Sequence, residues 1–563
     1  LYEKSIKLFP NSPQSYSNLG SLLRDQGEIE KAEILIRKSI DINPDYAESF
    51  FNLGSILFDK GQLEEAQVCI LKAIKLKPNL SSAYSTLYSI LRDKGQLEEA
   101  QKSIVKAIKL DPDRAYYYLN LASLLREKGQ IIEAEKLILK ALKISPEHAE
   151  AYCNLGSIQK ELGDIKDAEK SFRKSISLKS DLFESHYNLG CILNDLGNTK
   201  EAELSFRRSI EFNPNFLAAY VNLGTTLRNL GQLKAAENFL IKAIKIKTDI
   251  AKAYFVLSTL NSPFYKEEWE ENIFSETIFN QLSSEDKIDI YFARSNILHK
   301  KKNYTESTKY LKLANNLKLQ IRPVTSDILI NKSKEIFNEF SKLACKKFNH
   351  DLITENIFIV GMPRSGTTLL ESIISINPDV EDLGEANIFE ESYFEWIKFK
   401  GINSEVKLKK IYSDKVKELS KGSKITTNKW LYNYQYAGII SCQISNSKII
   451  HCYRNPLDNI LSIYRAHFAK GNSFSSSLED CAKVYLDQLE VMNEYKKIYN
   501  LNIYNLNYDL LVTNPNDEIK KLIAWLDWEW DDLYLSPHLN KRTVSTASSV
   551  QVRSPINARS LGS

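Results

Sequence analysis

The sequence lacks several features that would place it in a special class. None of its 563 residues lies in an apolar run of the roughly 18–20 residues that span a bilayer. Its seven cysteines form no CxxC pair and its seven histidines show no metal-ligand spacing. A zinc ribbon, a redox pair and a full disulfide framework are therefore disfavoured. Scattered thiols of this kind favour reduced cysteines and a cytoplasmic protein.

An excess of charge of either sign is also absent. Lys and Arg number 75 against 71 Asp and Glu, which leaves a net charge of +4. This near balance gives no reason to expect a nucleic-acid partner, and the missing apolar span gives none to expect a membrane partner. Hydrophobic residues at 43% and charged residues at 26% exclude a mostly disordered chain, and the length is sufficient for several domains.

What the sequence does contain is an internal repeat of 34 residues from Leu1 to about Leu260. Four kinds of residue keep this step. The glycines are Gly27, Gly61, Gly95, Gly129, Gly163, Gly197 and Gly231, and the alanines are Ala32, Ala66, Ala100, Ala134, Ala168, Ala202 and Ala236. The prolines are Pro10, Pro44, Pro78, Pro112, Pro146 and Pro214, and the aromatic residues are Tyr16, Phe50, Tyr84, Tyr118, Tyr152, Tyr220 and Tyr254.

Each of these residue types has a structural role in a pair of antiparallel helices. Glycine ends the first helix, where a left-handed conformation is needed, and proline stops the second helix. The small alanine lets the two helices approach closely, while the aromatic residue fills the shared core. The pattern resembles the tetratricopeptide repeat. This resemblance implies a helical solenoid whose concave groove binds a protein or peptide, with a spacer or a dimerisation surface as the alternative.

The repeat register fails after Leu260, although helical patterning continues to about Leu343. Within this stretch, DIYFARSNILHKKKNYTESTKYLKLANNLKLQ has the spacing of one divergent helix pair. The apolar faces at the end of a solenoid need a cap. We therefore predict a helical connector over residues 261–345 that caps the solenoid.

A different pattern begins near Asn356 and predicts a phosphate-binding turn. NIFIVG (356–361) is typical of a buried parallel strand, MPRSGTT is a tight loop, and LLESIISI continues as a helix. Together they aim backbone N–H groups at a phosphate. The spacing nearly fits a Walker A loop, but Thr367 stands where a nucleotide triphosphatase needs lysine, and the cation is Arg364. Hydrolysis of ATP or GTP is therefore disfavoured.

A second segment, SKIIHCYRNPLDNILSIYRAHF (447–468), places Arg454 at a predicted strand end and Ser462 two turns into the following helix. This pair can grip a terminal phosphate, and a surface pair of Arg454 with Asp458 is the alternative. GMPRSGTT resembles the 5′-phosphosulfate loop of the sulfotransferases, which use 3′-phosphoadenosine 5′-phosphosulfate (PAPS), and the second segment resembles their 3′-phosphate site. The resemblance implies that the residues binding PAPS include Arg364, Ser365, Gly366, Thr367, Thr368, Arg454 and Ser462.

Further segments make the chain similar to the tyrosylprotein sulfotransferases and to bacterial sulfotransferases fused to tetratricopeptide repeats. This resemblance implies that Glu385 in DLGEANIF is the catalytic base and that Lys429 in TTNKWLYN stabilises the transition state. It also implies that Tyr508 in LNYDLLVTNP contacts the nucleotide. Ser548 in STASSVQVRSPI would belong to a closing nucleotide loop with a catalytic role.

Each of these four residues also has a plain structural alternative. Glu385 follows Leu-Gly, where a carboxylate at a helix N-terminus complements the helix dipole. Lys429, beside Trp430, can be a solvated surface residue, and Tyr508 can be a core residue. Ser548 is one of several hydroxyls that compete in its loop.

Two nearby residues receive no firm role. The family often has a second basic residue after the 3′-phosphate arginine, but Ala466 stands there, with Arg465 adjacent. His451, near the end of the predicted strand, has no partner in sequence. We expect it to be structural.

The chemistry can be argued from the residues themselves. A hydroxyl is a poor nucleophile until a base takes its proton, and Glu385 is the candidate base. Negative charge builds on the bridging oxygen of the leaving nucleotide, where Lys429 and Arg364 are the candidate cations. Because fixed cations and N–H groups can take over a metal's role, we predict no metal.

The sequence therefore predicts an α + α/β multidomain protein. It consists of a tetratricopeptide solenoid (1–260), the connector (261–345) and a P-loop-like α/β sulfotransferase domain with a parallel sheet (346–563). The predicted reaction transfers the sulfuryl group of PAPS to an acceptor hydroxyl, with PAP as product. The favoured acceptor is a tyrosine of a protein or peptide presented by the repeats, and a saccharide or small molecule is the alternative. A non-catalytic scaffold with a relict nucleotide fold and a glycosyltransferase are the rivals from other classes.

The compartment and the assembly state are less constrained. Bacterial cytoplasm is the expected location, with a secretory compartment as the alternative, and a homodimer stays open. The chain opens at Leu1 inside an apparent helix, LYEKSIKLF, so we expect it to be part of a longer polypeptide.

Overall fold

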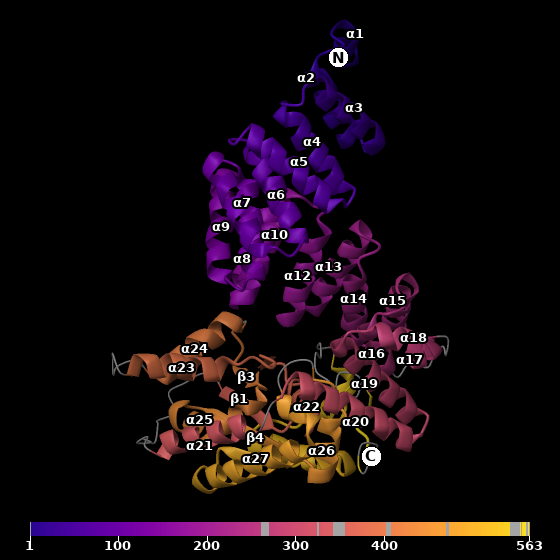
Figure 1. The fold of residues 1–563 in the computed structure, drawn as a ribbon. Helices are drawn as coiled ribbons and strands as arrows, with labels where there is room; N and C mark the ends of the chain where they lie inside the picture. Colours follow the sequence, from indigo (N-terminus) through magenta and orange to yellow (C-terminus); the bar gives the residue numbers. More distant parts are fainter. Residues whose placement is uncertain are drawn as a thin grey trace. The chain divides into compact units, whose positions relative to one another are not determined.

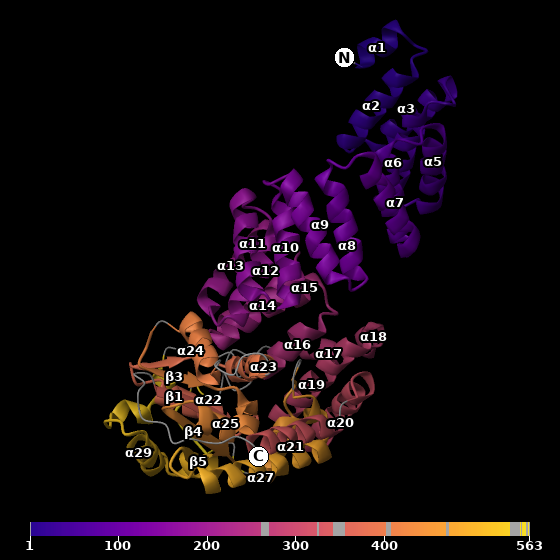
Figure 2. The same ribbon diagram turned by 90° about the vertical axis from the view of Figure 1, so that its left-hand side faces the viewer.

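The structure, a computed structural model, describes residues 2–260, 269–323, 326–341, 355–400, 407–420, 422–468 and 472–540, with Val552, 554–558 and Leu561. The chain divides into two compact units, Leu1–Leu193 with Glu211–Pro214, and Asn194–Ile210 with Asn215–Ser563 (Figures 1 and 2). Among the described helices, none combines the length and the apolar character that crossing a bilayer requires.

The predicted repeats form consecutive pairs of antiparallel helices. Each repeat glycine that follows a first helix has a positive φ, from +74° at Gly95 to +91° at Gly163, so the left-handed helix end is confirmed. Each repeat alanine is fully buried. The helices are α1 (Tyr2–Leu8), α2 (Pro13–Asp25), α3 (Ile29–Ile42), α4 (Ala47–Asp59), α5 (Leu63–Leu76), α6 (Ser81–Asp93), α7 (Leu97–Leu110), α8 (Ala115–Glu127), α9 (Ile131–Ile144), α10 (Ala149–Leu162), α11 (Ile165–Leu178), α12 (Phe183–Asp195), α13 (Thr199–Phe212), α14 (Leu217–Asn229), α15 (Leu233–Ile246) and α16 (Ala251–Thr259).

Helical structure continues in the segment predicted as a connector. Its described helices are α17 (Glu270–Phe274), α18 (Glu276–Gln281), α19 (Ser284–Lys300), α20 (Tyr304–Ile321) and α21 (Asp327–Ser341). Helices α19 and α20 form the hairpin that the spacing predicts, and α19 packs with α16. Helix α21 contributes Ile336 and Phe340 to the same hydrophobic cluster as Phe358 and Val360 of the first strand. Its apolar face is thus part of the core beside the sheet.

The C-terminal part is built on a parallel sheet with helices on both faces. The strands are β1 (Glu355–Gly361), β2 (Val380–Asp382), β3 (Ile425–Asn428), β4 (Ser447–Tyr453) and β5 (Ile503–Asn507), in the order β2-β3-β1-β4-β5. The register pairs Ile357 with Thr427 of β3 and with Lys448 of β4. Figure 1 shows β3, β1 and β4 between the helices. The predicted parallel-sheet α/β fold is confirmed.

Strand β1 is apolar from Ile357 to Val360 because both of its faces are covered. Phe358 and Val360 point into one cluster, and Ile357 and Ile359 point into the other. The helices and helical turns around the sheet are α22 (Thr367–Ile374), α23 (Ile388–Lys400), α24 (Leu408–Leu419), η2 (Leu431–Tyr436), α25 (Ala437–Gln443), α26 (Pro456–Tyr464), η3 (Ser473–Ser476), α27 (Leu478–Ile498), α28 (Tyr508–Thr513), α29 (Pro515–Leu526), η4 (Asp532–Leu535) and η5 (Pro537–Leu539).

The cysteines differ from the expectation at one position. Cys442, in α25, is part of a disulfide, so the expectation that all thiols are reduced is wrong there. Sequence spacing could not reveal this bond because it depends on which distant segments meet in space. The free thiols among the described residues are Cys69, Cys153, Cys191, Cys452 and Cys481.

Candidate functional site

The residues predicted to form the site follow the carboxyl ends of parallel strands. Gly361 ends β1, Lys429 follows β3, Arg454 follows β4 and Tyr508 follows β5, while Glu385 comes shortly after β2. In a parallel sheet these ends share one edge, and ligands of open α/β sheets bind there, where the direction of the crossovers switches. Strand β1, between β3 and β4, is that switch point.

The loop after β1 is held tightly by the chain around it. Ser365 Oγ donates a hydrogen bond to Met362 O at 2.7 Å, and Asn459 Nδ2 from α26 donates to Pro363 O at 3.0 Å. The backbone of Arg364 has φ +68°, a conformation that costs a non-glycine residue about 1–3 kcal/mol. Bonds on both sides of Arg364 hold it in that conformation, so the loop is preformed.

Two glycines in this segment are required by close approaches. Gly361 has φ +154°, and a Cβ there would lie 2.4 Å from Cys452 O of the neighbouring strand. Gly366 has φ +94°, and a Cβ there would lie 2.2 Å from Cδ2 of Tyr508. The ring of Tyr508 therefore packs directly on the loop, at the start of α22, and is only partly buried.

Arg454 is buried at the end of β4. Its side chain is 5% exposed, and its guanidinium carbon lies 5.1 Å from the centre of the Tyr508 ring. Tyr485 Oη donates to Arg454 O at 2.8 Å. Arg454 Nη2 also lies 3.6 Å from Asp458 Oδ2. The pair with Asp458 is thus present, but it is not the surface pair of the structural alternative, because the arginine is buried.

Arg364 contacts Ser462 and lies within electrostatic reach of two further arginines. Arg364 Nε donates to Ser462 Oγ at 3.2 Å. Burial lowers the pKa of Arg364 to about 10; Tyr508 opposes this shift, and the positive charges of Arg454 and Arg465 add to it. Like charges held together in this way are stabilised when an anion joins them. The residues present therefore fit a phosphate group of a nucleotide.

Lys429 is buried between two carboxylates. Its Nζ lies 2.8 Å from Glu371 Oε2 and 3.3 Å from Glu385 Oε1. The side chains of Lys429 and Glu371 are 2% and 0% exposed, whereas that of Glu385 is 50% exposed. A charge buried in protein needs a partner, and Glu371 provides it. Lys429 is therefore not a solvated surface residue, and Glu385 is the carboxylate of this group that a second molecule can reach.

The backbone around Glu385 is tied to the end of β3. Lys429 N donates to Gly384 O at 2.9 Å, and Asn428 Nδ2 donates to Ala386 O at 2.9 Å. These bonds flank Glu385 on both sides in the sequence. They fix its backbone beside Lys429 and leave half of its side chain in solvent.

Sequence analysis missed Glu371 and Asn459. Glu371 lies in LLESII of α22, and Asn459 lies in the first turns of α26. Both are fully buried. The signal that could have found Glu371 is a lone carboxylate in an otherwise apolar helix that must pack on a sheet, because such a charge needs a buried partner.

The remaining predicted residues take different places. Thr367 and Thr368 open α22 and are buried. His451 is buried in β4, where burial lowers its pKa to about 4, and its Nδ1 lies 3.3 Å from Asn505 Oδ1, in line with a structural role. Ser548 lies outside the described residues. Within the described ranges, no three His, Cys, Asp or Glu side chains are grouped so that they could hold a metal ion.

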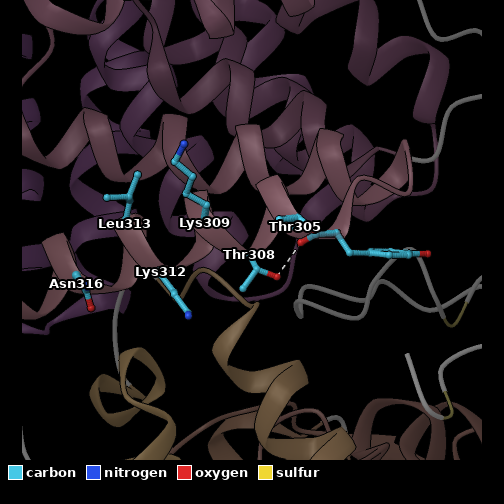
Figure 3. Close-up of a pocket in the computed structure, with 7 residues that line it drawn as sticks. Thr305, Thr308, Lys309, Lys312, Leu313 and Asn316 are labelled. Atoms are coloured by element: carbon cyan, nitrogen blue, oxygen red, sulfur yellow. Dashed lines mark hydrogen bonds between the residues drawn. The ribbon is translucent and has the colours of Figure 1, made fainter.

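An open pocket of about 660 Å³ lies on α20, away from the sheet edge (Figure 3). None of the predicted site residues lines it. Burial lowers the pKa of Arg465, and Tyr304, one of the lining residues of the pocket, opposes that shift. Its lining residues are Tyr304, Thr305, Thr308, Lys309, Lys312, Leu313 and Asn316.

Comparison with known families divides the chain into a repeat part and a C-terminal part. Residues 356–532 match the profile of the sulfotransferase family. The segments that match tetratricopeptide-repeat profiles are 1–34, 47–80, 82–114, 113–181, 183–216, 205–238 and 288–320.

Curated relatives are distant and cover part of the chain. A protein-tyrosine sulfotransferase of Drosophila melanogaster is 25% identical over 36% of this chain and 46% of its own length. Protein-tyrosine sulfotransferase A of Caenorhabditis elegans is 23% identical over 36% of this chain and 60% of its own length. An uncharacterized protein of Aquifex aeolicus is 28% identical over 54% of this chain and 43% of its own length. The chain thus spans about half the length of the curated relatives it matches.

Solved structures resemble parts of the chain. A chain of the APC/C heterotetramer Cut9–Hcn1 is 16% identical, with a TM-score of 0.40, over 46% of this chain and 50% of its own length. PilF of Pseudomonas aeruginosa is 17% identical, with a TM-score of 0.35, over 37% of this chain and 94% of its own length.

Proposed function

Because the chain joins tetratricopeptide repeats to a domain of the sulfotransferase family, we propose that it transfers a sulfuryl group from PAPS to an acceptor hydroxyl and releases PAP. One observation above all supports this proposal. An arginine cluster suited to phosphate and an accessible carboxylate paired with a buried lysine stand along the same sheet edge. The arginine cluster can bind the donor PAPS, and the carboxylate can activate the acceptor hydroxyl.

The reaction would divide among these residues as follows. Glu385 accepts the proton of the acceptor hydroxyl, whose oxygen forms the new bond to sulfur. The bond between sulfur and the bridging oxygen breaks, and its electron pair stays on PAP. Lys429 and Arg364 stabilise the negative charge that builds on that oxygen. Ser548, in its predicted loop, would donate a hydrogen bond to the same group.

The donor PAPS would be bound by the segments at the edge of the sheet where the carboxyl ends of the strands lie. The loop after β1 and the first residues of α22 suit the 5′-phosphate, because hydroxyls and N–H groups converge there. Arg454 and Ser462 suit the 3′-phosphate, and Tyr508 would contact the nucleotide. Residues assigned to the 5′ side are Arg364, Ser365, Gly366, Thr367 and Thr368.

A thermal-shift titration with PAP tests the donor site. A ligand that binds only the folded chain stabilises it by about 2.7 kcal/mol at a hundred times its Kd. We expect PAP to raise the melting temperature and AMP, which lacks the 3′-phosphate, to raise it less. Arg364→Ala should abolish the PAP shift, whereas Arg37→Ala, an exposed arginine of the repeats, should preserve it.

Other outcomes of this titration would overturn the proposal. If PAP up to millimolar concentration leaves the melting temperature unchanged, the sulfotransferase assignment fails for this chain. A shift with a UDP-sugar instead would favour a glycosyltransferase. A chain that responds to none of these nucleotides would be a repeat scaffold with a relict nucleotide fold.

We further propose a tyrosine of a protein or peptide as the acceptor. Two curated relatives carry the name protein-tyrosine sulfotransferase, and a long repeat groove suits an extended polypeptide or a protein partner. A saccharide or small-molecule hydroxyl is the second candidate. Release of PAP from PAPS in the presence of a tyrosine peptide, a saccharide or p-nitrophenol separates these acceptors.

The proposed compartment depends on the acceptor and on the oxidation state of the cysteines. Cytoplasm is the default proposal, but the disulfide at Cys442 favours the alternative of an oxidising, secretory location. Alkylation of thiols in freshly lysed cells, with and without a reductant, would show whether Cys442 is oxidised in the cell.

A further inference from the structure

The hairpin of α19 and α20 belongs to the repeats by sequence, yet one of its faces contacts the sulfotransferase domain. Residues 288–320 match a tetratricopeptide-repeat profile. The contact is with residues 464–468, which begin at the last residue of α26 and contain Arg465. Helix α20 meets the end of α26 through Asn315 and Tyr464, and the two helices are labelled next to each other in Figure 1.

Two buried side chains of α20 hold the ends of this segment. Asn315 Nδ2 donates to Tyr464 O at 3.1 Å, and Lys318 Nζ donates to Phe468 O at 2.8 Å. Asn315 is 1% exposed and Lys318 is 9% exposed. Burying an amide and a lysine costs free energy unless each is hydrogen-bonded. Packing alone would need only apolar residues. Their polar atoms fix two backbone carbonyls on either side of Arg465.

A third contact comes from α19. His467 Nε2 lies 2.7 Å from Asp289 Oδ1, and the His467 ring stacks on Phe292 with the ring centres 4.6 Å apart. Phe255 of α16 meets the same imidazole edge-on at 4.9 Å. The segment is therefore fastened to the hairpin at Tyr464, His467 and Phe468.

Arg465 stands between these fastened positions and next to the arginine cluster. It caps the C-terminus of α26, three residues after Ser462, which accepts a hydrogen bond from Arg364 Nε at 3.2 Å, and its charge acts on Arg364. It also acts on His299, and Tyr304 acts on it, both from the end of the hairpin where α19 meets α20. Arg465 is thus bordered by the sheet-edge cluster and by the last repeat-like hairpin.

We propose that Asn315 and Lys318 are positioning residues of the donor site, holding residues 464–468 so that Arg465 adds its charge beside Arg454 and Ser462, the residues assigned to the 3′-phosphate. The repeat-like hairpin is then part of the nucleotide site and not a cap alone. This inference rests on the proposed function, because the 3′-phosphate belongs to the proposed donor.

The test compares the affinities of the full chain for PAP and for AMP. The two nucleotides differ in the 3′-phosphate, so their affinity ratio reports on that subsite alone. Asn315→Ala and Lys318→Met should each weaken PAP about tenfold and leave AMP within about twofold, since one charged contact to phosphate is at stake. Lys318→Arg, which retains a donor, should recover most of the loss.

Two further variants sharpen the comparison. Asn316→Ala, on the exposed face of α20, is the matched control and should leave both affinities unchanged. Arg465→Ala should lower the ratio as much as Asn315→Ala does. The double variant Asn315→Ala/Arg465→Ala should lose nothing more, because both changes remove the same interaction.

The possible results separate this inference from the proposed function. If the unmodified chain fails to bind PAP, the proposed function falls, and this inference falls with it. If the unmodified chain prefers PAP over AMP but Asn315→Ala and Lys318→Met keep that preference, only the positioning role is overturned. Equal losses for PAP and AMP would also overturn it, since a merely structural role predicts them, and Asn315→Ser offers a milder change should Asn315→Ala fail to fold.

Discussion

A chain in which Glu385 is replaced by glutamine is expected to bind PAP normally and to lose about 10²–10⁴-fold in kcat for sulfuryl transfer. Glutamine keeps the shape of the side chain and one oxygen that can face Lys429, but it cannot accept the acceptor's proton. Glu385 is the carboxylate in question because its side chain is half exposed, whereas Glu371, on the other side of Lys429, is fully buried. Release of PAP from PAPS with a fixed acceptor measures kcat, and calorimetric titration measures PAP affinity.

The matched control for this variant is Glu391→Gln. Glu391 is an exposed glutamate in the first turn of α23, and its replacement should change neither kcat nor PAP affinity. An unchanged kcat in Glu385→Gln would contradict the role of base. A parallel fall of kcat and PAP affinity would instead mean that Glu385 acts by holding its loop in place.

The fold could be predicted from the sequence wherever the signal is local and periodic. The repeats keep one register for over two hundred residues, and the glycine of each unit adopts the left-handed conformation that its position predicts. The strand 356–361 could be recognised because it is apolar on both faces, as a central parallel strand must be. The loop that follows was recognisable from its glycines and hydroxyls.

Contacts between distant segments could not be predicted from the sequence, because their signal is neither local nor periodic. Asn459 supports the loop through Pro363 O, and Asn315 holds the carbonyl of Tyr464, yet nothing in their own sequence surroundings sets these asparagines apart from others. Their roles arise only when the strand order brings α22, α26 and α20 together.

Burial was the other quantity that the sequence left open. The structural alternative for Lys429 required a solvated side chain, and the one for Arg454 required a surface pair. Their exposures of 2% and 5% remove both alternatives. A buried cation beside a phosphate loop is suited to binding an anion, because the low dielectric strengthens its field.

Replacing Lys429 by methionine is expected to destabilise the domain by about 3–5 kcal/mol and to abolish turnover. Methionine fills a similar volume but leaves Glu371 buried with its charge uncompensated by the lysine, which is the costly way to break a buried pair. The contact with Glu385 adds little to this loss, because half of that side chain is hydrated. Urea-induced unfolding measures the stability, and release of PAP from PAPS measures the turnover.

The double variant Lys429→Met/Glu371→Leu separates the two roles of the lysine. Removing both charges leaves an apolar pair of similar volume, so most of the lost stability should return, since replacing a whole buried ion pair is often neutral. Turnover should stay abolished, because the lysine that faces the leaving oxygen beside Arg364 is still missing. If the double variant regained turnover, Lys429 would serve only to neutralise Glu371. If Lys429→Met alone were as stable as the unmodified chain, the buried ion pair of Lys429 and Glu371 would be contradicted. Glu385 would then no longer be singled out as the carboxylate open to an acceptor, because that assignment depends on Glu371 being the buried partner of Lys429.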